Sequence, residues 1–205
     1  MSLMNKGMLY VVSAPSGCGK GTILTEVFKN CKNVFYSISA TTRAPREGEV
    51  DGVNYYFITR DEFEALIESG GMLEYAEYCG NMYGTPLKKV EEKLEAGFDV
   101  ILEIETRGAK LVKEKMPEAT TIFILPPSVK ELRRRLLKRG TESADVIEKR
   151  VSEAEREIRE AYNYDYVMVN GELSVAISDF TAIIMAAKLE KSKTKKLIDE
   201  VLENA

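Results

Sequence analysis

The chain has 205 residues, 44% of them hydrophobic and 30% charged, with a formal net charge of −4. These proportions are typical of a globular domain and exclude a disordered or collagen-like chain. The absence of histidine excludes serine–histidine and cysteine–histidine catalysis and any metal site built on imidazole. The cysteines, Cys18, Cys31 and Cys79, are too dispersed for a zinc knuckle or a CxxC pair, and their odd number argues against a disulfide framework.

The charge and the hydropathy pattern point away from nucleic acid and membranes. An acidic chain has no overall attraction to nucleic acid. No apolar run approaches the roughly 18 residues of a membrane span. We therefore expect a reduced, cytoplasmic protein with neither nucleic acid nor a membrane as a partner. The length predicts one domain over 1–205, and monomer and homo-oligomer both stay open.

The apolar runs predict a series of strands. Short β-branched runs are typical of buried parallel strands, and weaker alternation is typical of exposed ones. In chain order the expected strands are 8–13, 34–39, 55–58, 72–79, 82–85, 98–104, 120–125 and 165–169. We expect 72–79 and 82–85 to form a hairpin that turns at Gly80-Asn81.

Amphipathic spacing predicts helices between most of these strands. Pro86 is expected in the first turn of its helix, and Ser128 is expected to cap another. The expected helices are 21–30, 60–69, 86–96, 110–115, 128–137, 140–162 and 173–188. Strands and helices alternate at both ends of the chain, which predicts a parallel sheet covered on both faces. The segment 39–85 breaks this alternation, and we interpret it as an inserted subdomain. We interpret the lysine-rich stretch 188–196 as the solvated face of a helix.

The most informative segment is a glycine-rich loop between the first strand and the first helix. Polyphosphate oxygens need several converging backbone N–H donors, and glycine permits the close approach. The N-terminal end of the following helix attracts the anion, and Lys20 adds a mobile positive charge. This context predicts a P-loop for a nucleoside triphosphate. The residues expected to bind the triphosphate are Ala14, Pro15, Ser16, Gly17, Cys18, Gly19, Lys20, Gly21 and Thr22.

This loop departs from the pattern G-x-x-x-x-G-K-[ST] at two positions. Ala14 replaces the first glycine, and Gly21 stands where a magnesium-binding hydroxyl usually follows the lysine. Thr22 comes one position later, where its hydroxyl could bond a phosphate. We therefore assign no direct metal ligand.

A second loop carries Arg43 and Arg46, three residues apart around Pro45. Two guanidinium groups can hold a phosphate monoester in a bidentate manner. Two arginines in an exposed loop can equally be solvated surface, and the pair alone favours that interpretation.

The wider motifs resemble the guanylate kinase family. The resemblance rests on the run SxSxTTRxPRxGExxGxxY from Ser37 to Tyr55, on the P-loop, and on several shorter motifs, and it extends from about residue 9 to 180. The shorter motifs are Glu74-Tyr75-Ala76, Gly80-Asn81-x-Tyr83-Gly84-Thr85, Leu102-Glu103-Ile104-Glu105, Pro126-Pro127-Ser128 and Arg139-Gly140-Thr141-Glu142. Glu103 and Glu105 occupy positions where the family more often has aspartate.

The resemblance implies a P-loop NTPase-type three-layer α/β fold with a parallel central sheet. The expected core is 7–38 with 86–130 and 161–205. The implied mixed GMP-binding subdomain is 39–85, and the implied helical lid is 131–160.

The resemblance also implies transfer of the γ-phosphoryl group of ATP to GMP, giving ADP and GDP. The implied cofactor is Mg²⁺, held mainly by nucleotide phosphates and water. ATP and GMP are the implied small-molecule partners. The implied GMP-binding residues are Ser39, Arg43, Arg46, Tyr55, Glu74, Tyr83, Thr85 and Glu105, and the implied catalytic residues are Lys20, Arg43, Arg135, Arg139 and Arg150.

Two other functions are possible on the same motifs. One is a non-catalytic guanylate-kinase-like binding module, which would lose the P-loop lysine and the lid arginines; Lys20, Arg135 and Arg139 argue against it. The other is a P-loop kinase for a different acceptor, against which Glu74 and the loop around Ser39 argue. A carboxylate accepts both N1–H and N2–H of guanine but faces an unprotonated N1 in adenine.

Overall fold

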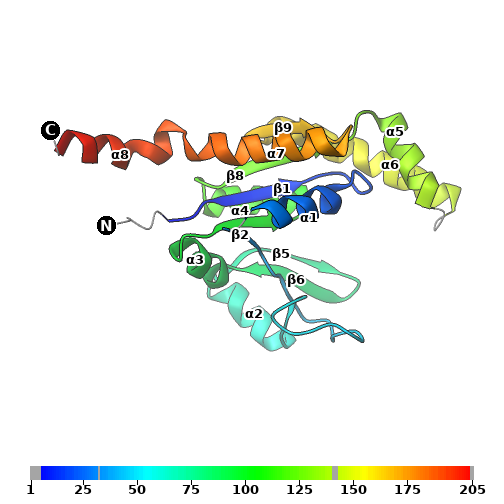
Figure 1. The fold of residues 1–205 in the computed structure, drawn as a ribbon. Coiled ribbons are helices and arrows are strands. Elements are labelled where there is room, and N and C mark those ends of the chain that lie inside the picture. Colours follow the sequence, from blue (N-terminus) through cyan, green and yellow to red (C-terminus); the bar gives the residue numbers. More distant parts are fainter. Residues whose placement is uncertain (1–5, 32, 140–142, 204–205) are drawn as a thin grey trace. The chain divides into compact units, whose positions relative to one another are not determined.

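The computed structural model describes residues 6–31, 33–139 and 143–203, without the side chains of residues 30, 139, 144, 191–193 and 195–197 (Figure 1). The order of the elements confirms the expected α/β class. The strands are β1 (Leu9–Ser13), β2 (Val34–Tyr36), β3 (Ala40–Thr41), β4 (Tyr56–Phe57), β5 (Met72–Tyr78), β6 (Asn81–Pro86), β7 (Asp99–Glu103), β8 (Thr120–Leu125) and β9 (Tyr166–Val169). The helices are α1 (Lys20–Asn30), α2 (Arg60–Glu68), α3 (Leu87–Glu95), α4 (Thr106–Lys115), α5 (Val129–Arg139), α6 (Ala144–Arg159), α7 (Leu173–Lys188) and α8 (Lys191–Glu203), with the 3₁₀ turn η1 (Glu160–Asn163) after α6.

The larger sheet has five strands in the order β2-β7-β1-β8-β9. Both β1–β7 and β2–β7 are parallel pairs, and Val12 of β1 lies opposite Glu103 of β7. All five residues of β1 are buried, as expected for a strand with neighbours on both sides in a sheet covered by helices. This register places the carboxyl end of β7 beside the strand that leads into the glycine-rich loop.

The smaller sheet occupies the segment expected to be inserted. Its order is β4-β3-β6-β5, with β3–β4 parallel and the other pairs antiparallel. A cluster of buried side chains joins this sheet to α2, which begins with a capping box between Thr59 and Glu62. The cluster consists of Ala40, Phe63, Met72 and Met82.

Several expected boundaries need correction. Pro86 ends β6 and is the N-cap of α3, so it precedes the first turn that we expected to contain it. The hairpin turns at Cys79-Gly80, with φ values of 49° and 75°, one residue before the expected pair. Two successive residues with positive φ characterise a type I′ turn, whose twist matches that of the strands. The strand expected over 34–39 ends at Tyr36.

The chain folds into two compact units, 1–14 with 31–122 and 15–30 with 123–205. The first contains the small sheet with α2, α3 and α4. The second contains the glycine-rich loop, α1 and the helices from α5 onward. In the second unit α5 and α6 pack through Leu132, Leu136, Ile147, Val151 and Ala154.

Two features of the second unit bear on the sequence expectations. Ser128 accepts a hydrogen bond from the backbone N–H of Glu131 at 3.0 Å, as the predicted cap requires. The lysine-rich stretch enters α8, a helix that the sequence analysis did not delimit.

Within the described residues, no helix is both long enough and apolar enough to cross a membrane.

Candidate active site

The glycine-rich loop of the second unit has the backbone that a phosphate site needs. Gly17 and Gly19 have φ values of 87° and 91°, a conformation that other residues rarely adopt. The carbonyl of Gly19 accepts from the N–H groups of Thr22 at 3.1 Å and Ile23 at 3.3 Å, which starts α1 at Lys20. The positive end of the α1 dipole therefore lies at this loop, where an anion is favoured.

Neighbouring elements leave no room for side chains at these two glycines. A Cβ at Gly17 would lie 2.7 Å from Cδ2 of Leu136, and a Cβ at Gly19 would lie 2.6 Å from Nδ2 of Asn170. Both positions therefore require glycine for its conformation and for its size.

Arg135 on α5 is bound directly to this loop. Its Nη1 donates to the carbonyl of Cys18 at 3.2 Å, and its Nη2 donates to the carbonyl of Asn170 at 3.0 Å. Nδ2 of Asn170 donates to the same Cys18 carbonyl at 2.7 Å. Nε of Arg135 donates to Glu131 at 2.9 Å, and hydrogen bonds from Arg134 and Arg135 lower the pKa of Glu131 to about 2. Glu131 is therefore ionised at neutral pH and orients the arginine.

Cys18 is a buried part of the loop framework. Its thiol donates to the carbonyl of Ile124 at 3.4 Å. Burial raises the pKa of the thiol to about 11, against the opposing effect of the Arg135 and Lys20 charges. A neutral thiol at physiological pH is a poor nucleophile, so this cysteine has a structural role.

The remaining predicted cationic residues of the second unit lie on three helices. Lys20 is the first residue of α1 and is half-buried, and Arg150 on α6 is also half-buried. Arg139 ends α5, but its side chain lies outside the described ones. By contrast, Arg133 and Arg134 are 46% and 65% exposed and pair with Glu148 and Glu131 on the helix surface.

The first unit brings three of the predicted GMP-binding residues, Arg43, Tyr55 and Tyr83, together. The guanidinium carbon of Arg43 lies 5.5 Å from the ring centroid of Tyr55, and the rings of Tyr55 and Tyr83 meet edge to face at 6.0 Å. Both terminal nitrogens of Arg43 donate to Glu49 at 2.9 Å. Arg46 is exposed, and its backbone N–H donates to Glu49 at 2.7 Å. Glu49 therefore organises the loop that carries both arginines.

Glu74 is a buried carboxylate on β5. It is 8% exposed, and Oγ1 of Thr85 on the paired strand β6 donates to its Oε1 at 2.6 Å. Burial raises the pKa of Glu74; the Thr85 hydrogen bond opposes this rise, and the charge of Glu105 adds to it. Glu105 is exposed at the N-cap of α4 and makes no side-chain cap bond. Two of the predicted GMP-binding residues, Glu74 and Thr85, are therefore in direct contact.

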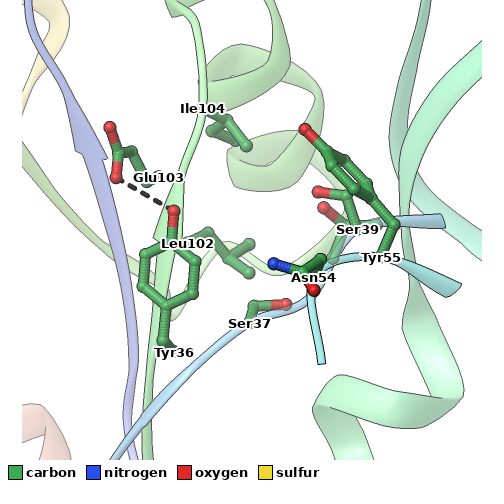
Figure 2. A pocket seen from close by; sticks show the side chains of 9 residues that line it. Tyr36, Ser37, Ser39, Asn54, Tyr55, Leu102, Glu103 and Ile104 are labelled. Carbon is green, nitrogen blue, oxygen red and sulfur yellow. Dashed lines mark hydrogen bonds between the residues drawn. The ribbon is translucent and has the colours of Figure 1, made fainter. Parts of the chain in front are cut away.

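A pocket in the first unit collects residues from both of its sheets (Figure 2). Figure 2 shows Glu103 and Ile104 on one wall, with Ser39, Asn54 and Tyr55 on the other. The hydroxyl of Tyr36 donates to Oε2 of Glu103 at 2.9 Å. Burial and the neighbouring Glu103 raise the pKa of Tyr36 above its usual range. The lining residues are Tyr36, Ser37, Ser39, Asn54, Tyr55, Thr85, Leu102, Glu103 and Ile104.

Three residues with a clear place in the site were missed by the sequence analysis. Asn170 follows β9, and its position after a strand of the parallel sheet could have singled it out. Glu49 stands inside the arginine motif, but its role depends on a loop conformation that spacing does not reveal. Gly108 has no local signal, because its neighbour Glu74 is distant in the sequence.

The described residues include no group of three or more Cys, Asp and Glu side chains placed to hold a metal ion. Glu103 is half-buried at the carboxyl end of β7, opposite Val12 in the strand before the glycine-rich loop. One carboxylate of this kind fits a Mg²⁺ ion that keeps several waters and takes its other ligands from phosphates.

The fold and the loop define a class. A parallel α/β sheet whose strand β1 leads through a glycine-rich turn and Lys20 into α1 is the architecture of a P-loop protein. Comparison with known proteins narrows this class. The sequence pattern of the family "Guanylate kinase" matches residues 6–187. The chain belongs to the guanylate kinase family.

Individual relatives agree with this assignment. The guanylate kinase of Halalkalibacterium halodurans is 50% identical over 195 residues, covering 95% of this chain and 94% of the relative. That of Streptococcus pneumoniae is 53% identical over 185 residues, covering 90% and 89%. The crystal structure of guanylate kinase from Anaplasma phagocytophilum superposes with a TM-score of 0.71 at 34% identity, covering 92% of this chain and 90% of that one.

Proposed function

We propose that this chain transfers the γ-phosphoryl group of ATP to GMP, forming ADP and GDP. Membership of the guanylate kinase family supports this reaction. The observation that carries the choice of acceptor is the buried carboxylate of Glu74, held by the Thr85 hydroxyl at 2.6 Å. It suits the paired N1–H and N2–H donors of guanine, whereas adenine would present an acceptor to it.

GMP binding is assigned to the first unit. Arg43 and Arg46 would take the phosphate, with Tyr55 and Tyr83 as hydroxyl donors beside Arg43. Ser39, Glu74, Thr85 and Glu105 would surround the base. The clustering of Arg43, Tyr55 and Tyr83, and the contact between Glu74 and Thr85, support this division.

ATP binding is assigned to the loop Ala14–Thr22, whose N–H groups would receive the polyphosphate. Lys20 would approach the β- and γ-phosphates, and Arg135, Arg139 and Arg150 would add charge to the transferring group. The two hydrogen bonds from Arg135 to Cys18 and Asn170 support its place beside this loop. When bound, Mg²⁺ would screen the phosphate charges, and Glu103 could accept hydrogen bonds from its water ligands.

The reaction needs alignment more than proton transfer. A GMP phosphate oxygen forms the new bond to the γ-phosphorus as the bond to the β,γ-bridging oxygen breaks, and ADP leaves. The second pKa of a phosphate monoester is about 6, so the attacking oxygen is ionised at neutral pH and requires no general base. A chain without histidine is compatible with this chemistry. The cationic side chains have to offset repulsion between two polyanions and hold them in line.

A coupled assay of ADP release, with GMP, AMP, CMP and dTMP compared as acceptors, tests the proposal. We expect turnover with GMP to exceed that with the other three by at least tenfold. Absence of turnover with every acceptor would identify a binding module, and a preference for AMP or dTMP would identify a kinase for another acceptor. Reactions without acceptor measure ATP hydrolysis and are subtracted.

A further inference from the structure

Gly108 occupies an unusual place for a glycine. It is buried in the first turn of α4, and it is not among the glycines with positive φ. Glycine destabilises a helix interior relative to alanine, because it loses more conformational freedom on folding. Since the helical backbone here would accept any L-residue, conformation does not explain this glycine. Its lack of a side chain must be the feature that matters.

The atom that approaches Gly108 most closely belongs to Glu74. A Cβ at position 108 would lie 3.1 Å from Oε2 and 3.5 Å from Cδ of Glu74, and 3.3 Å from Cδ1 of Ile104. The other oxygen, Oε1, is held by Thr85 at 2.6 Å. The carboxylate is thus fixed on one side by a hydroxyl and rests on the other against a backbone without a side chain. A methyl group at 108 would push Oε2 while Thr85 retains Oε1, and so rotate the carboxylate.

The helix end itself favours a carboxylate at this place. The N-cap residue of α4, Glu105, makes no side-chain cap bond. The first-turn N–H groups carry the positive end of the helix dipole, which stabilises a nearby anion. Close approach of Glu74 to this turn therefore opposes the effect of burial, and a side chain at 108 would force the carboxylate to move away by a few tenths of an ångström.

We propose that Gly108 is a specificity-determining positioning residue, whose missing side chain lets the Glu74 carboxylate take the orientation that guanine recognition needs. Guanine presents two donors side by side, so recognition depends on the orientation of both carboxylate oxygens. The inference rests on the proposed function. It assigns to Gly108 a part in the preference of the enzyme for GMP over IMP, which lacks the 2-amino group.

The first experiment compares Gly108→Ala with the wild-type protein. We expect kcat/KM for GMP to fall by about tenfold, mostly through KM, as a misaligned bidentate contact implies. KM for ATP should stay within twofold, and the preference for GMP over IMP should narrow. Lys110→Ala is the matched control, because Lys110 is exposed two residues later on the other side of α4. Thermal unfolding and GMP binding by calorimetry verify that the variant folds.

A double-mutant cycle with Glu74→Asp separates positioning from a general effect on the helix. Aspartate is shorter by one methylene and leaves space for the alanine methyl, so Gly108→Ala should change kcat/KM by less than twofold in that background. An equal loss in both backgrounds, or no loss in the wild-type background, would overturn the inference. If the wild-type protein phosphorylates no GMP at all, the proposed function fails; normal wild-type activity with an unaffected Gly108→Ala variant contradicts this inference alone.

Discussion

Glu49 holds Arg43 at two points: Nη1 donates to Oε2 and Nη2 to Oε1, each at 2.9 Å. Nη1 also donates to the carbonyl of Ala44 at 2.8 Å. The guanidinium group has five N–H donors, so these contacts fix its plane and leave donors for a second anion. The hydrogen bonds from Arg43 and from the backbone of Arg46 lower the pKa of Glu49, which keeps it ionised.

We predict that Glu49→Gln raises KM for GMP by about two- to fivefold, because one partner of a partly buried ion pair in a surface loop is neutralised, with kcat nearly unchanged. The amide can still accept one hydrogen bond but holds the guanidinium less firmly. Glu47→Gln, an exposed change two residues earlier, is the control and should leave KM unchanged. Lower KM in Glu49→Gln would mean that the carboxylate competes with the substrate phosphate.

Removal of the P-loop lysine should abolish catalysis without loss of the fold. Groups of this kind can contribute a factor of about 10³ or more to phosphoryl transfer, so we expect Lys20→Ala to lower kcat at least that far. Circular dichroism and the thermal midpoint should match the wild-type values. Lys29→Ala on the same helix is the control, since Lys29 is 62% exposed and pairs with Glu26. A near-native rate for Lys20→Ala would refute the role of Lys20.

We expect the substitution Glu74→Gln to lower the activity with GMP and to raise the stability of the fold at high pH. Without a second acceptor oxygen, kcat/KM for GMP should fall by about 10- to 100-fold. Burial raises the pKa of Glu74 above 4.5, so the folded protein binds this proton more tightly than the unfolded chain. The cost of the buried charge is absent below the unfolded pKa and complete above the folded pKa.

The thermal midpoint of the Glu74→Gln variant should therefore exceed that of the wild-type protein at about pH 8, and the difference should vanish by about pH 4. Differential scanning calorimetry across this range provides the measurement. Glu77→Gln, on the exposed part of the same strand, should show no such trend. A midpoint below the wild-type value at pH 8 would contradict the buried-charge argument.

The sequence revealed those parts of the fold that depend on local order. The run Leu9–Ser13 is apolar throughout and the following glycines are tightly spaced, so strand, loop and helix could be predicted together. The strands near 55–58, 72–79 and 82–85 could also be predicted, because turn residues separate these short runs. The turn at Cys79-Gly80 could not, because Cys79 adopts a positive φ that its side chain does not favour.

The parts of the site that escaped prediction depend on distant contacts. Glu74 and Gly108 are far apart in the chain, and nothing in the spacing indicates that one limits the other. Arg135 and Asn170 meet at the Cys18 carbonyl only because α5 and the end of β9 both reach the loop. Family motifs can mark such residues as important, but their partners become visible only in the folded chain.

Cys18 should resist alkylation in the folded protein. Burial raises the pKa of its thiol to about 11, so the thiolate is scarce at pH 8, and the side chain is fully buried. Exposed Cys79 should react with iodoacetamide first, and Cys18 only after denaturation. Peptide mass spectrometry after timed labelling gives the order in which the cysteines are alkylated. Labelling of native Cys18 as fast as Cys79 would show that the loop opens readily.

Asn170→Ala should weaken ATP binding more than GMP binding. Nδ2 of Asn170 donates to the Cys18 carbonyl at 2.7 Å and lies 2.6 Å from the position that a Cβ on Gly19 would take, so the amide packs against the loop. The Cys18 carbonyl keeps its hydrogen bond from Arg135, so loss of the Asn170 hydrogen bond costs about 0.5–1.5 kcal/mol. The void left beside Gly19 adds to this cost, and both should lower the thermal midpoint.

A looser loop holds its N–H groups in less uniform directions, so KM for ATP should rise several-fold while KM for GMP changes by less than twofold. Asn163→Ala is the matched control, because Asn163 makes only an exposed contact to Glu160 among those described. Asn170→Asp adds a further test. It keeps the shape but replaces the donor with an acceptor that faces the Cys18 carbonyl, so it should impair ATP binding at least as much as alanine does. Equal effects on both substrates would instead indicate general destabilisation of the fold.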